Sequence, residues 1–231
     1  MLKKFKLFSK LKFNVIEHPK ITYDKLKRQK WLKLKTSIPR KTNDFAGLLF
    51  AKQKLRGFYG NCPEHTFVKL YTRAKKLNGN TGANFIQLLE SRLDSVLFRM
   101  RFANTFEEIH QMIAHKHICV NNSVVTIKSF ALQPGDIVSI KQESFDFVYN
   151  RVLFNKMKYY NLSSSDQKTN NEPIIKLQSK HILGFTPDYL EINYNMLTGI
   201  FLNLPSLSEV KYPFIVDLSK IIEYYEYKRK L

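Results

Sequence analysis

The 231-residue sequence is poor in the residues that cross-link small folds or bind metals. It has only two cysteines, Cys62 and Cys119, which lie 57 positions apart. A disulfide framework or a structural zinc site needs more cysteines at closer spacing, so the pair predicts neither and favours a reducing compartment. Glycine, alanine, proline and arginine are also scarce, whereas phenylalanine, tyrosine, isoleucine, asparagine and lysine are plentiful. This skew toward residues with AT-rich codons suggests an AT-rich genome, such as that of an organelle.

Long apolar runs are missing as well. No stretch reaches the roughly 18 apolar residues that a transmembrane helix requires, and the basic N-terminus lacks the continuous apolar segment of a secretory signal. Residues 1–27 contain no arginine and few hydroxyl side chains, which is unlike a transit peptide. A basic protein made inside an organelle would need no import signal. We therefore expect no membrane partner.

Acidic residues are outnumbered two to one. The chain has 38 Lys and Arg against 19 Asp and Glu, a net charge of +19. Residues 1–41 hold 14 of the basic residues and only two acidic ones, Glu17 and Asp24. Such a charge favours a polyanionic partner, and the aromatic residues interleaved with these lysines are typical of nucleic-acid binding. The alternative is that this arm is only a solvated tail.

Residues 88–140 are the most informative part of the chain. Apolar residues recur at three- and four-residue steps from Leu89 to Met100, which predicts one face of a helix. Arg92 and Arg99 fall on the opposite face, so this helix is expected to carry a basic edge.

A second helix and a small sheet are predicted next. A Thr-x-x-Glu capping box at 105–108 begins a helix that closes on the cationic run 115–117. Residues 118–127 predict a hairpin with an Asn-Asn turn, and a Pro-Gly-Asp turn at 134–136 leads into a last strand over 137–140. Two short helices followed by small strands, with a basic junction between them, make a compact platform for a phosphate backbone.

These residues resemble the S-four RNA-binding domain, in the version carried by the small-subunit ribosomal protein of that family. The family has a Leu-Leu-Glu-x-Arg-Leu-Asp opening, here 88–94, a His-Lys-x-Ile-x-Val-Asn core, here 115–121, and a Pro-x-Asp close, here 134–136. The domain also occurs in several RNA enzymes, so the flanking residues decide the function. These flanks resemble the ribosomal family from about residue 40 to 231, at 52–60, 81–84, 187–191, 197–199, Pro205 and 221–225.

The chain departs from the family pattern in several places. The N-terminal cysteine cluster of bacterial members is absent, and Tyr189 replaces a Trp. Residues 141–186 are longer than the usual connector and form an insertion, whose aromatic-rich first part either contacts a neighbouring protein or packs back on its own domain. The apolar run 201–207 replaces a basic segment, which favours a protein contact there over an RNA contact.

The expected fold is α+β. It consists of a helical N-terminal part, an S-four-type RNA-binding domain of two short helices and small antiparallel strands, and a C-terminal strand and helix segment that packs back. The expected domains are a basic arm (1–41), a helical body (42–86 together with 187–231), the RNA-binding domain (87–140) and an insertion or connector (141–186). Gly79 and Gly82 are expected either to take positive φ in a turn or to cap a helix.

The expected RNA contacts come from cationic, amide and aromatic side chains. Lys52, Arg56 and Tyr59 fall at helical spacing, and such a face suits phosphate and base contacts. The full set is Lys52, Lys54, Arg56, Tyr59, Arg92, Arg99, His115, Lys116, His117, Asn121 and Lys128. The alternation of His115, His117 and Cys119 could also indicate a metal cluster, but a structural zinc site needs four ligands at recognisable spacing. No metal, cofactor or catalytic residue is predicted.

The resemblance implies a structural protein of the small ribosomal subunit that binds and organises small-subunit rRNA beside neighbouring ribosomal proteins, with no small-molecule substrate. It also implies contact with a junction in the 5′ domain of the rRNA. Two alternatives remain: an RNA pseudouridine synthase, whose nucleophilic Asp lies in a motif similar to 92–94, and a stand-alone S-four-domain factor. We expect Asp94 to be structural, pairing with an Arg or capping a helix. The codon skew favours an organelle-encoded protein of the mitochondrial ribosome, with the plastid ribosome as the alternative.

Overall fold

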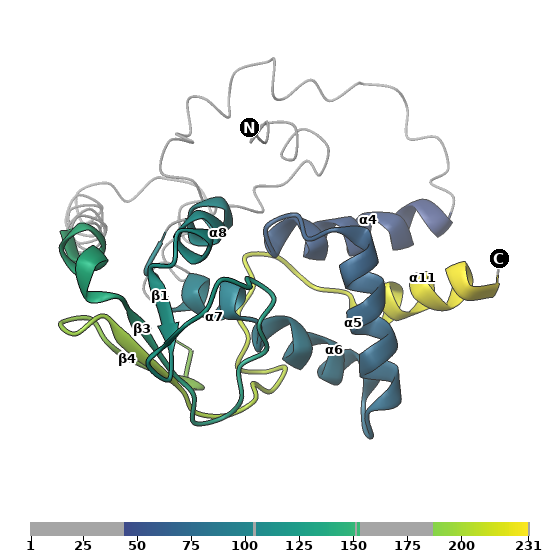
Figure 1. Cartoon of the computed structure of the whole chain (residues 1–231). Helices are drawn as coiled ribbons and strands as arrows, with labels where there is room; N and C mark the ends of the chain where they lie inside the picture. Colours follow the sequence, from purple (N-terminus) through teal and green to yellow (C-terminus); the bar gives the residue numbers. More distant parts are fainter. Residues whose placement is uncertain (1–43, 104, 151, 153–186, 231) are drawn as a thin grey trace, which may run out of the picture. The chain divides into compact units, whose positions relative to one another are not determined.

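A computed structural model describes residues 44–103, 105–150, 152 and 187–230. They form two compact units, one made of 44–85 and 214–230 and the other of 86–213 (Figure 1). The predicted basic arm and most of the predicted insertion lie outside the described residues.

The first unit is helical. It comprises α4 (Asp44–Phe58), α5 (Glu64–Lys76), the first part of α6 (Thr81–Glu90) and α11 (Leu218–Lys230). Phe67, Tyr71 and Ala74 of α5 are buried because they recur at three- and four-residue steps, as the sequence predicted. The Phe67 ring packs edge-on against Phe85 with centroids 5.4 Å apart, and the Tyr71 ring stacks on Tyr225 at 4.7 Å. Aromatic packing therefore holds this small unit together.

The turn between α5 and α6 depends on a glycine and an asparagine. Gly79 has φ of +101°, which confirms the expected positive φ. Gly82 instead lies inside the first turn of α6, so the expectation that it sits in the turn is wrong. The Asn80 side chain caps this helix by accepting a hydrogen bond from the Gly82 backbone N–H at 2.8 Å.

The second unit is built on a five-stranded antiparallel sheet with the order β2-β1-β3-β5-β4. Its strands are β1 (Ile118–Val120), β2 (Ser123–Val124), β3 (Ile137–Ile140), β4 (Leu190–Asn193) and β5 (Thr198–Phe201). Asn121 and Asn122 have φ of 47° and 64°, which gives the two-residue turn that fits a twisted hairpin. The hairpin is shorter than predicted, because β2 ends at Val124.

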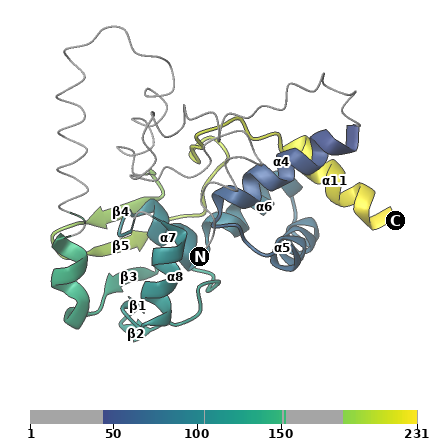
Figure 2. The same ribbon diagram turned by 90° about the horizontal axis from the view of Figure 1, so that it is seen from above.

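Two helices complete the core of this unit: α7 (Leu93–Arg99) and α8 (Phe106–Ala114) lie beside the sheet (Figure 2). Ile118 lies opposite Ile140 and Val120 opposite Val138, and all four side chains are buried. Buried side chains of α8, namely Ile109, Met112 and Ile113, add to this core. The α8 N-terminus begins as predicted, with the Thr105 hydroxyl accepting a hydrogen bond from the Glu108 backbone N–H at 3.3 Å. The α+β fold expected from the sequence is confirmed.

The helix predicted across 88–100 is in fact two helices. The backbone of Arg92 is extended, with φ of −72° and ψ of 140°, and separates α6 from α7. It pairs with Ala131 in an isolated β-bridge. The Leu93 N–H donates to the Phe130 carbonyl and the Leu132 N–H donates to the Ser91 carbonyl, both at 2.8 Å. The loop 128–132 therefore takes the hydrogen bonds that a continuous helix would have used.

Residues 187–213 need a correction to the predicted domains. We expected all of 187–231 to join the helical body. Instead, β4 and β5 extend the sheet of the second unit, because β5 pairs with β3, and only residues from Phe214 onward join the helices. The first part of the predicted insertion also packs on this unit: the 3₁₀ turn η1 (Gln142–Ser144) leads into a helix over 145–150, and Val148 is buried.

One buried ion pair joins distant parts of the second unit. The Arg99 guanidinium donates to both oxygens of the Glu90 carboxylate, at 2.6 and 3.0 Å, and also to the Lys211 carbonyl at 2.9 Å. The Tyr189 hydroxyl donates to Glu90 at 2.9 Å, and burial together with this carboxylate raises the pKa of Tyr189 far above its usual range. Arg99 is therefore buried, so the predicted basic edge is wrong at this position.

We expect an Arg99→Met variant to lose roughly 3–5 kcal/mol of unfolding free energy, because it leaves the Glu90 carboxylate buried without its cation. The measurement is urea unfolding of the full chain. A Glu90→Gln/Arg99→Met double variant is the control, and it should recover part of the loss because no buried charge remains. A loss below about 1 kcal/mol in the single variant, as for a surface pair, would contradict this role.

Candidate RNA-binding surface

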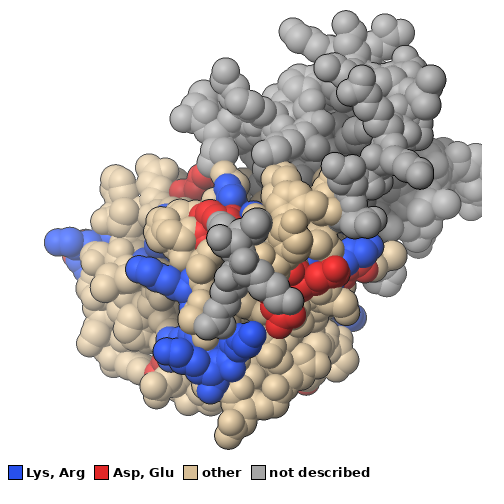
Figure 3. Space-filling view, turned by 90° about the vertical axis from the view of Figure 1, so that its right-hand side faces the viewer, with Lys and Arg blue, Asp and Glu red and all other residues tan. Residues whose placement is uncertain are grey.

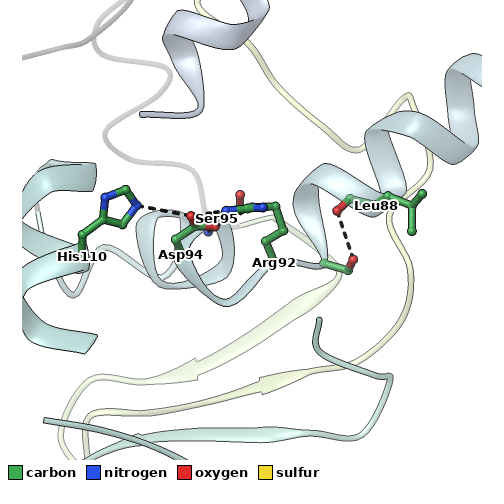
Figure 4. Close-up of polar contacts among 6 residues, drawn as sticks. Leu88, Arg92, Asp94, Ser95 and His110 are labelled. Atoms are coloured by element: carbon green, nitrogen blue, oxygen red, sulfur yellow. Dashed lines mark hydrogen bonds and ion pairs between the residues drawn. The ribbon is translucent and has the colours of Figure 1, made fainter. Parts of the chain in front are cut away.

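A second buried ion pair lies at the N-terminus of α7. The Arg92 guanidinium donates to both oxygens of Asp94, at 2.7 and 3.0 Å, and His110 of α8 lies 3.3 Å from the same carboxylate (Figure 4). The Ser95 backbone N–H also donates to Asp94 at 2.9 Å, so this side chain also binds the backbone of the first turn of α7. Of the two structural roles predicted for Asp94, pairing with an Arg is confirmed, whereas capping is not, because the N-cap position of α7 is Arg92 and has no side-chain cap hydrogen bond.

Electrostatics keep this carboxylate ionised. Burial alone would raise the pKa of Asp94, but the hydrogen bonds and positive charge of His110 and Arg92 outweigh it and lower the pKa below its ordinary value. Arg92 is itself buried. Both arginines of the predicted basic edge are thus held inside by carboxylates.

The same site positions the loop that carries Lys128. The Asp94 backbone N–H donates to the Lys128 carbonyl at 3.2 Å, next to the bond from Leu93 to Phe130. The Lys128 side chain is exposed. The Asp94 carboxylate also contacts His110, so one residue, through its backbone and its side chain, links this loop to α8, whose C-terminus leads into His115.

The residues after α8 form an exposed cationic junction, which we define as 115–117. His115 and Lys116 are exposed and His117 is half-buried. The two imidazole rings stack with centroids 5.9 Å apart, and Lys116 between them has φ of 64°. The His117 ring is also bound to the Ser144 hydroxyl, which fixes one side of this turn. The predicted junction is therefore accessible.

Asn121 has a structural contact of its own. Its side-chain amide donates to Asp136 at 2.9 Å, and its carbonyl oxygen accepts from the Ile137 backbone N–H at 3.0 Å. Asp136 also accepts from the Gln133 N–H at 2.7 Å. These bonds hold the hairpin turn against the predicted Pro-Gly-Asp turn, in which Gly135 has φ of 94°. Asn121 remains exposed.

The four predicted contacts in the first unit differ widely in accessibility. Lys52 is only 4% exposed and donates to Glu64 at 2.9 Å and to the Tyr224 hydroxyl at 3.1 Å. Arg56 is partly exposed and donates to Glu64 at 3.1 Å. Tyr59 is buried. The helix face that the spacing suggested for RNA therefore packs mainly inside this unit.

Glu64 is the centre of that packing. Burial would raise its pKa, but the hydrogen bonds and charges of Lys52 and Arg56 lower the pKa below its ordinary value. Lys54 lies half-buried with its ammonium 4.7 Å from the Phe214 ring centroid, and burial lowers the pKa of Lys54. Of the four, Lys54 and Arg56 keep some exposure for an outside partner.

Sequence reasoning missed a set of exposed cations on α5. Because Phe67, Tyr71 and Ala74 face inward, the opposite side of this helix faces out. It carries Lys69, Arg73 and Lys76, and beside them Lys75, which pairs with Glu226 at 3.6 Å; all four are exposed. The same amphipathic spacing that identified the buried side could have identified these residues. Lys and Arg side chains gather in a group on the face drawn in Figure 3.

Two other kinds of site do not occur in the part of the chain that the structure describes. No three His, Cys, Asp or Glu side chains there come together as metal ligands, and Cys119 is buried in β1. None of the helices described is both long and apolar enough to span a bilayer.

We expect Asp94→Asn to lower the unfolding free energy at pH 7 by roughly 2–5 kcal/mol, because Arg92 loses its buried counter-charge. The folded-state pKa of Asp94 lies below the ordinary value of 3.8, so its stabilisation is complete above pH 3.8 and is lost as pH falls through the lower folded pKa. The difference between wild type and variant should therefore shrink only below pH 3.8, in urea titrations at several pH values. The exposed Asp188 supplies the control, Asp188→Asn. A difference that did not depend on pH would contradict the assignment.

Two known families together match residues 2–138 of the chain. The description "Ribosomal protein S4/S9 N-terminal domain" matches residues 2–90, and "S4 domain" matches residues 91–138. The second range contains both the Arg92–Asp94 pair and the cationic junction.

Individual relatives agree with these matches. The small ribosomal subunit protein uS4m of Reclinomonas americana is 34% identical over 181 residues, which are 78% of this chain and 65% of that protein. The small ribosomal subunit protein uS4 of Phenylobacterium zucineum is 36% identical over 185 residues, 80% of this chain and 78% of that protein. That of Paracoccus denitrificans is 34% identical with the same coverage. The chain belongs to the uS4 family of small ribosomal subunit proteins.

Proposed function

We propose that this chain is a structural protein of the small subunit of a mitochondrial ribosome, where it binds and organises small-subunit rRNA. The observation that carries the proposal is the match to the uS4 family, which runs without a gap from residue 2 to 138. Members of this family are structural proteins rather than enzymes, and the chain shares their role of binding rRNA and other small-subunit proteins.

The exposed side chains of the second unit suit RNA. Lys116, Lys128 and the two histidines of the junction offer N–H donors and positive charge to phosphate oxygens. The Asp94 site fixes the backbone of the 128–130 loop and, through His110, the helix that leads to the junction. Pre-ordered cations lose less conformational entropy on binding than cations on a free chain. We assign direct rRNA contact to these residues, and to Lys54 and Arg56 in the first unit.

The buried members of the expected set have a different role. Lys52, Tyr59, Arg92 and Arg99 are all less than 10% exposed, and the three cations among them each face a carboxylate. We assign them to the frame that supports the surface. The exposed cations of α5 are added to the rRNA-binding set in their place.

The pseudouridine synthase alternative is not supported. Asp94 would have to act as a nucleophile, but its oxygens accept hydrogen bonds from Arg92 and from the Ser95 backbone, and His110 lies against one of them. A carboxylate that is buried and paired in this way cannot reach a substrate base without unfolding the start of α7.

The mitochondrial location rests on two observations. One relative is a mitochondrial protein by name, and the composition is rich in residues with AT-rich codons. Bacterial relatives are equally similar. Fractionation that finds the chain in small ribosomal subunits from mitochondria, and not from plastids or cytosol, tests this assignment.

We expect the affinity for a small-subunit rRNA fragment containing the 5′-domain junction to fall steeply with salt, by a log–log slope of about −0.7 to −0.9 for each phosphate contact. Lys116→Ala and Lys128→Ala should each reduce the slope by about that amount. Filter binding from low to high salt measures it. Lys220→Ala removes an exposed lysine that pairs with Asp217, and it serves as the matched control. An affinity that did not depend on salt would refute electrostatic binding.

We also expect the arm and the insertion to differ in their partners. Deleting 1–30 removes much of an arm with 14 basic residues, and should weaken binding to naked rRNA at least tenfold. Deleting 155–180 should leave that affinity nearly unchanged and impair assembly with other small-subunit proteins. The second deletion starts at 155 because Val148 and Val152 are buried in the second unit. Equal losses of rRNA affinity from both deletions would show that the division is wrong.

A further inference from the structure

The segment after β5 is tied down at several points. We call residues 201–210 the leucine loop. Phe201, Pro205 and Val210 are buried and hold it to the second unit. The Leu202 backbone N–H donates to the Tyr189 carbonyl at 3.0 Å, and the Phe201 N–H donates to the Asp136 carbonyl at 3.0 Å. The loop is therefore an ordered part of the unit rather than a loose connection.

Its closing turn is also held internally. The Ser206 backbone N–H donates to the Glu209 carboxylate at 3.0 Å, and the Glu209 N–H donates to the Ser206 carbonyl at 3.2 Å. The hydroxyls of Ser206 and Ser208 lie 2.9 Å apart. The polar groups of this turn therefore bind one another, and these bonds fix the shape of the loop.

Three leucines face out from this fixed backbone. Leu202, Leu204 and Leu207 are 45%, 47% and 40% exposed. Exposed leucines scattered singly need no explanation, but three within six residues of an anchored loop form a local apolar surface. Because Phe201, Pro205 and Val210 already occupy the inward positions, the leucines cannot turn inward without displacing them.

The leucine loop itself carries no lysine or arginine that could bind RNA. From Ile192 to Ser208 the sequence contains no charged residue, although the chain is 25% charged and has a net charge of +19. The charged residues at either end of this run are Glu191 and Glu209. A phosphate backbone is bound through cations, and carboxylates repel it. The cationic junction of the same unit therefore suits RNA, whereas the leucine loop does not.

We propose that the leucine loop docks into a neutral, apolar groove of another protein of the small subunit. The proposal rests on the proposed function, because it takes the neighbours to be those of a ribosomal protein. Exposed Asn203 and the two serine hydroxyls give the leucines a polar rim, as at protein interfaces with an apolar centre. A specific interface buries about 800 Å² on each side, so the loop supplies the anchoring residues and not the whole contact.

Photo-crosslinking in assembled subunits tests the docking. The chain is expressed with benzoyl-phenylalanine in place of Leu204, and small subunits that contain it are purified and irradiated. The expected result is a covalent adduct to one other small-subunit protein, identified by mass spectrometry. Adducts only to rRNA, to residues of this same chain, to a second copy or to lipid would overturn the proposal, as would no adduct at all.

A matched pair of variants separates docking from RNA binding. Leu204→Ser should reduce incorporation into small subunits at least fivefold and leave affinity for the rRNA fragment within twofold of wild type. Ile215→Ser changes another exposed residue, 84% exposed in the first unit, and should alter neither quantity. Equal incorporation of both variants would overturn the proposal. If wild type itself neither binds the rRNA nor enters small subunits, the proposed function fails; if it does both and only the Leu204 results are negative, docking alone fails.

Discussion

The carboxylate of Glu90 is fully buried, and keeping it paired organises most of the second unit. An unpaired buried charge is so costly that its partners must be in place in the folded state. Here the partners are Arg99, nine residues away, and Tyr189, 99 residues away. Tyr189 directly precedes β4, so the pairing fixes where the C-terminal hairpin joins the sheet begun by β1 and β3. The same guanidinium reaches the Lys211 carbonyl and so also holds the segment after the leucine loop.

In both units, acidic side chains, which are scarce in this chain, pair with lysines and arginines that are buried or partly buried. Glu90 and Asp94 are buried beside cations, and the partly buried Glu64 binds two more. A chain with twice as many basic as acidic residues can assign a few lysines and arginines to internal pairs and still present a cationic surface. The net charge therefore describes the partner class, and burial decides which individual cations can reach that partner. Lys52 and Lys116 illustrate the two outcomes.

Local signals in the sequence predicted much of the fold and less of the surface. The strands at 118–120 and 137–140, the cap at Thr105 and the asparagine turn follow from spacing and turn chemistry, and all are present. The expected basic edge failed because helical spacing shows which residues share a face, but not what covers that face. Arg99 is bound by the Lys211 carbonyl, 112 positions later, and lies over the Tyr212 ring, whereas Lys52 is bound by the Tyr224 hydroxyl, 172 positions later. Long-range pairing of this kind cannot be seen in a local pattern.

The second unit divides its surface by charge. The junction and Lys128 sit on a backbone that Asp94 holds in place, while the β4–β5 hairpin and the leucine loop carry no charged residue between Glu191 and Glu209. RNA binding and protein binding need opposite surfaces. Phosphates are bound by cations, whereas the centre of an apolar protein interface lacks charged side chains. A single small unit can serve both only if the two surfaces are kept apart and each is rigid. The buried Glu90 and Asp94 pairs supply that rigidity from inside, because each binds groups from more than one element of the unit.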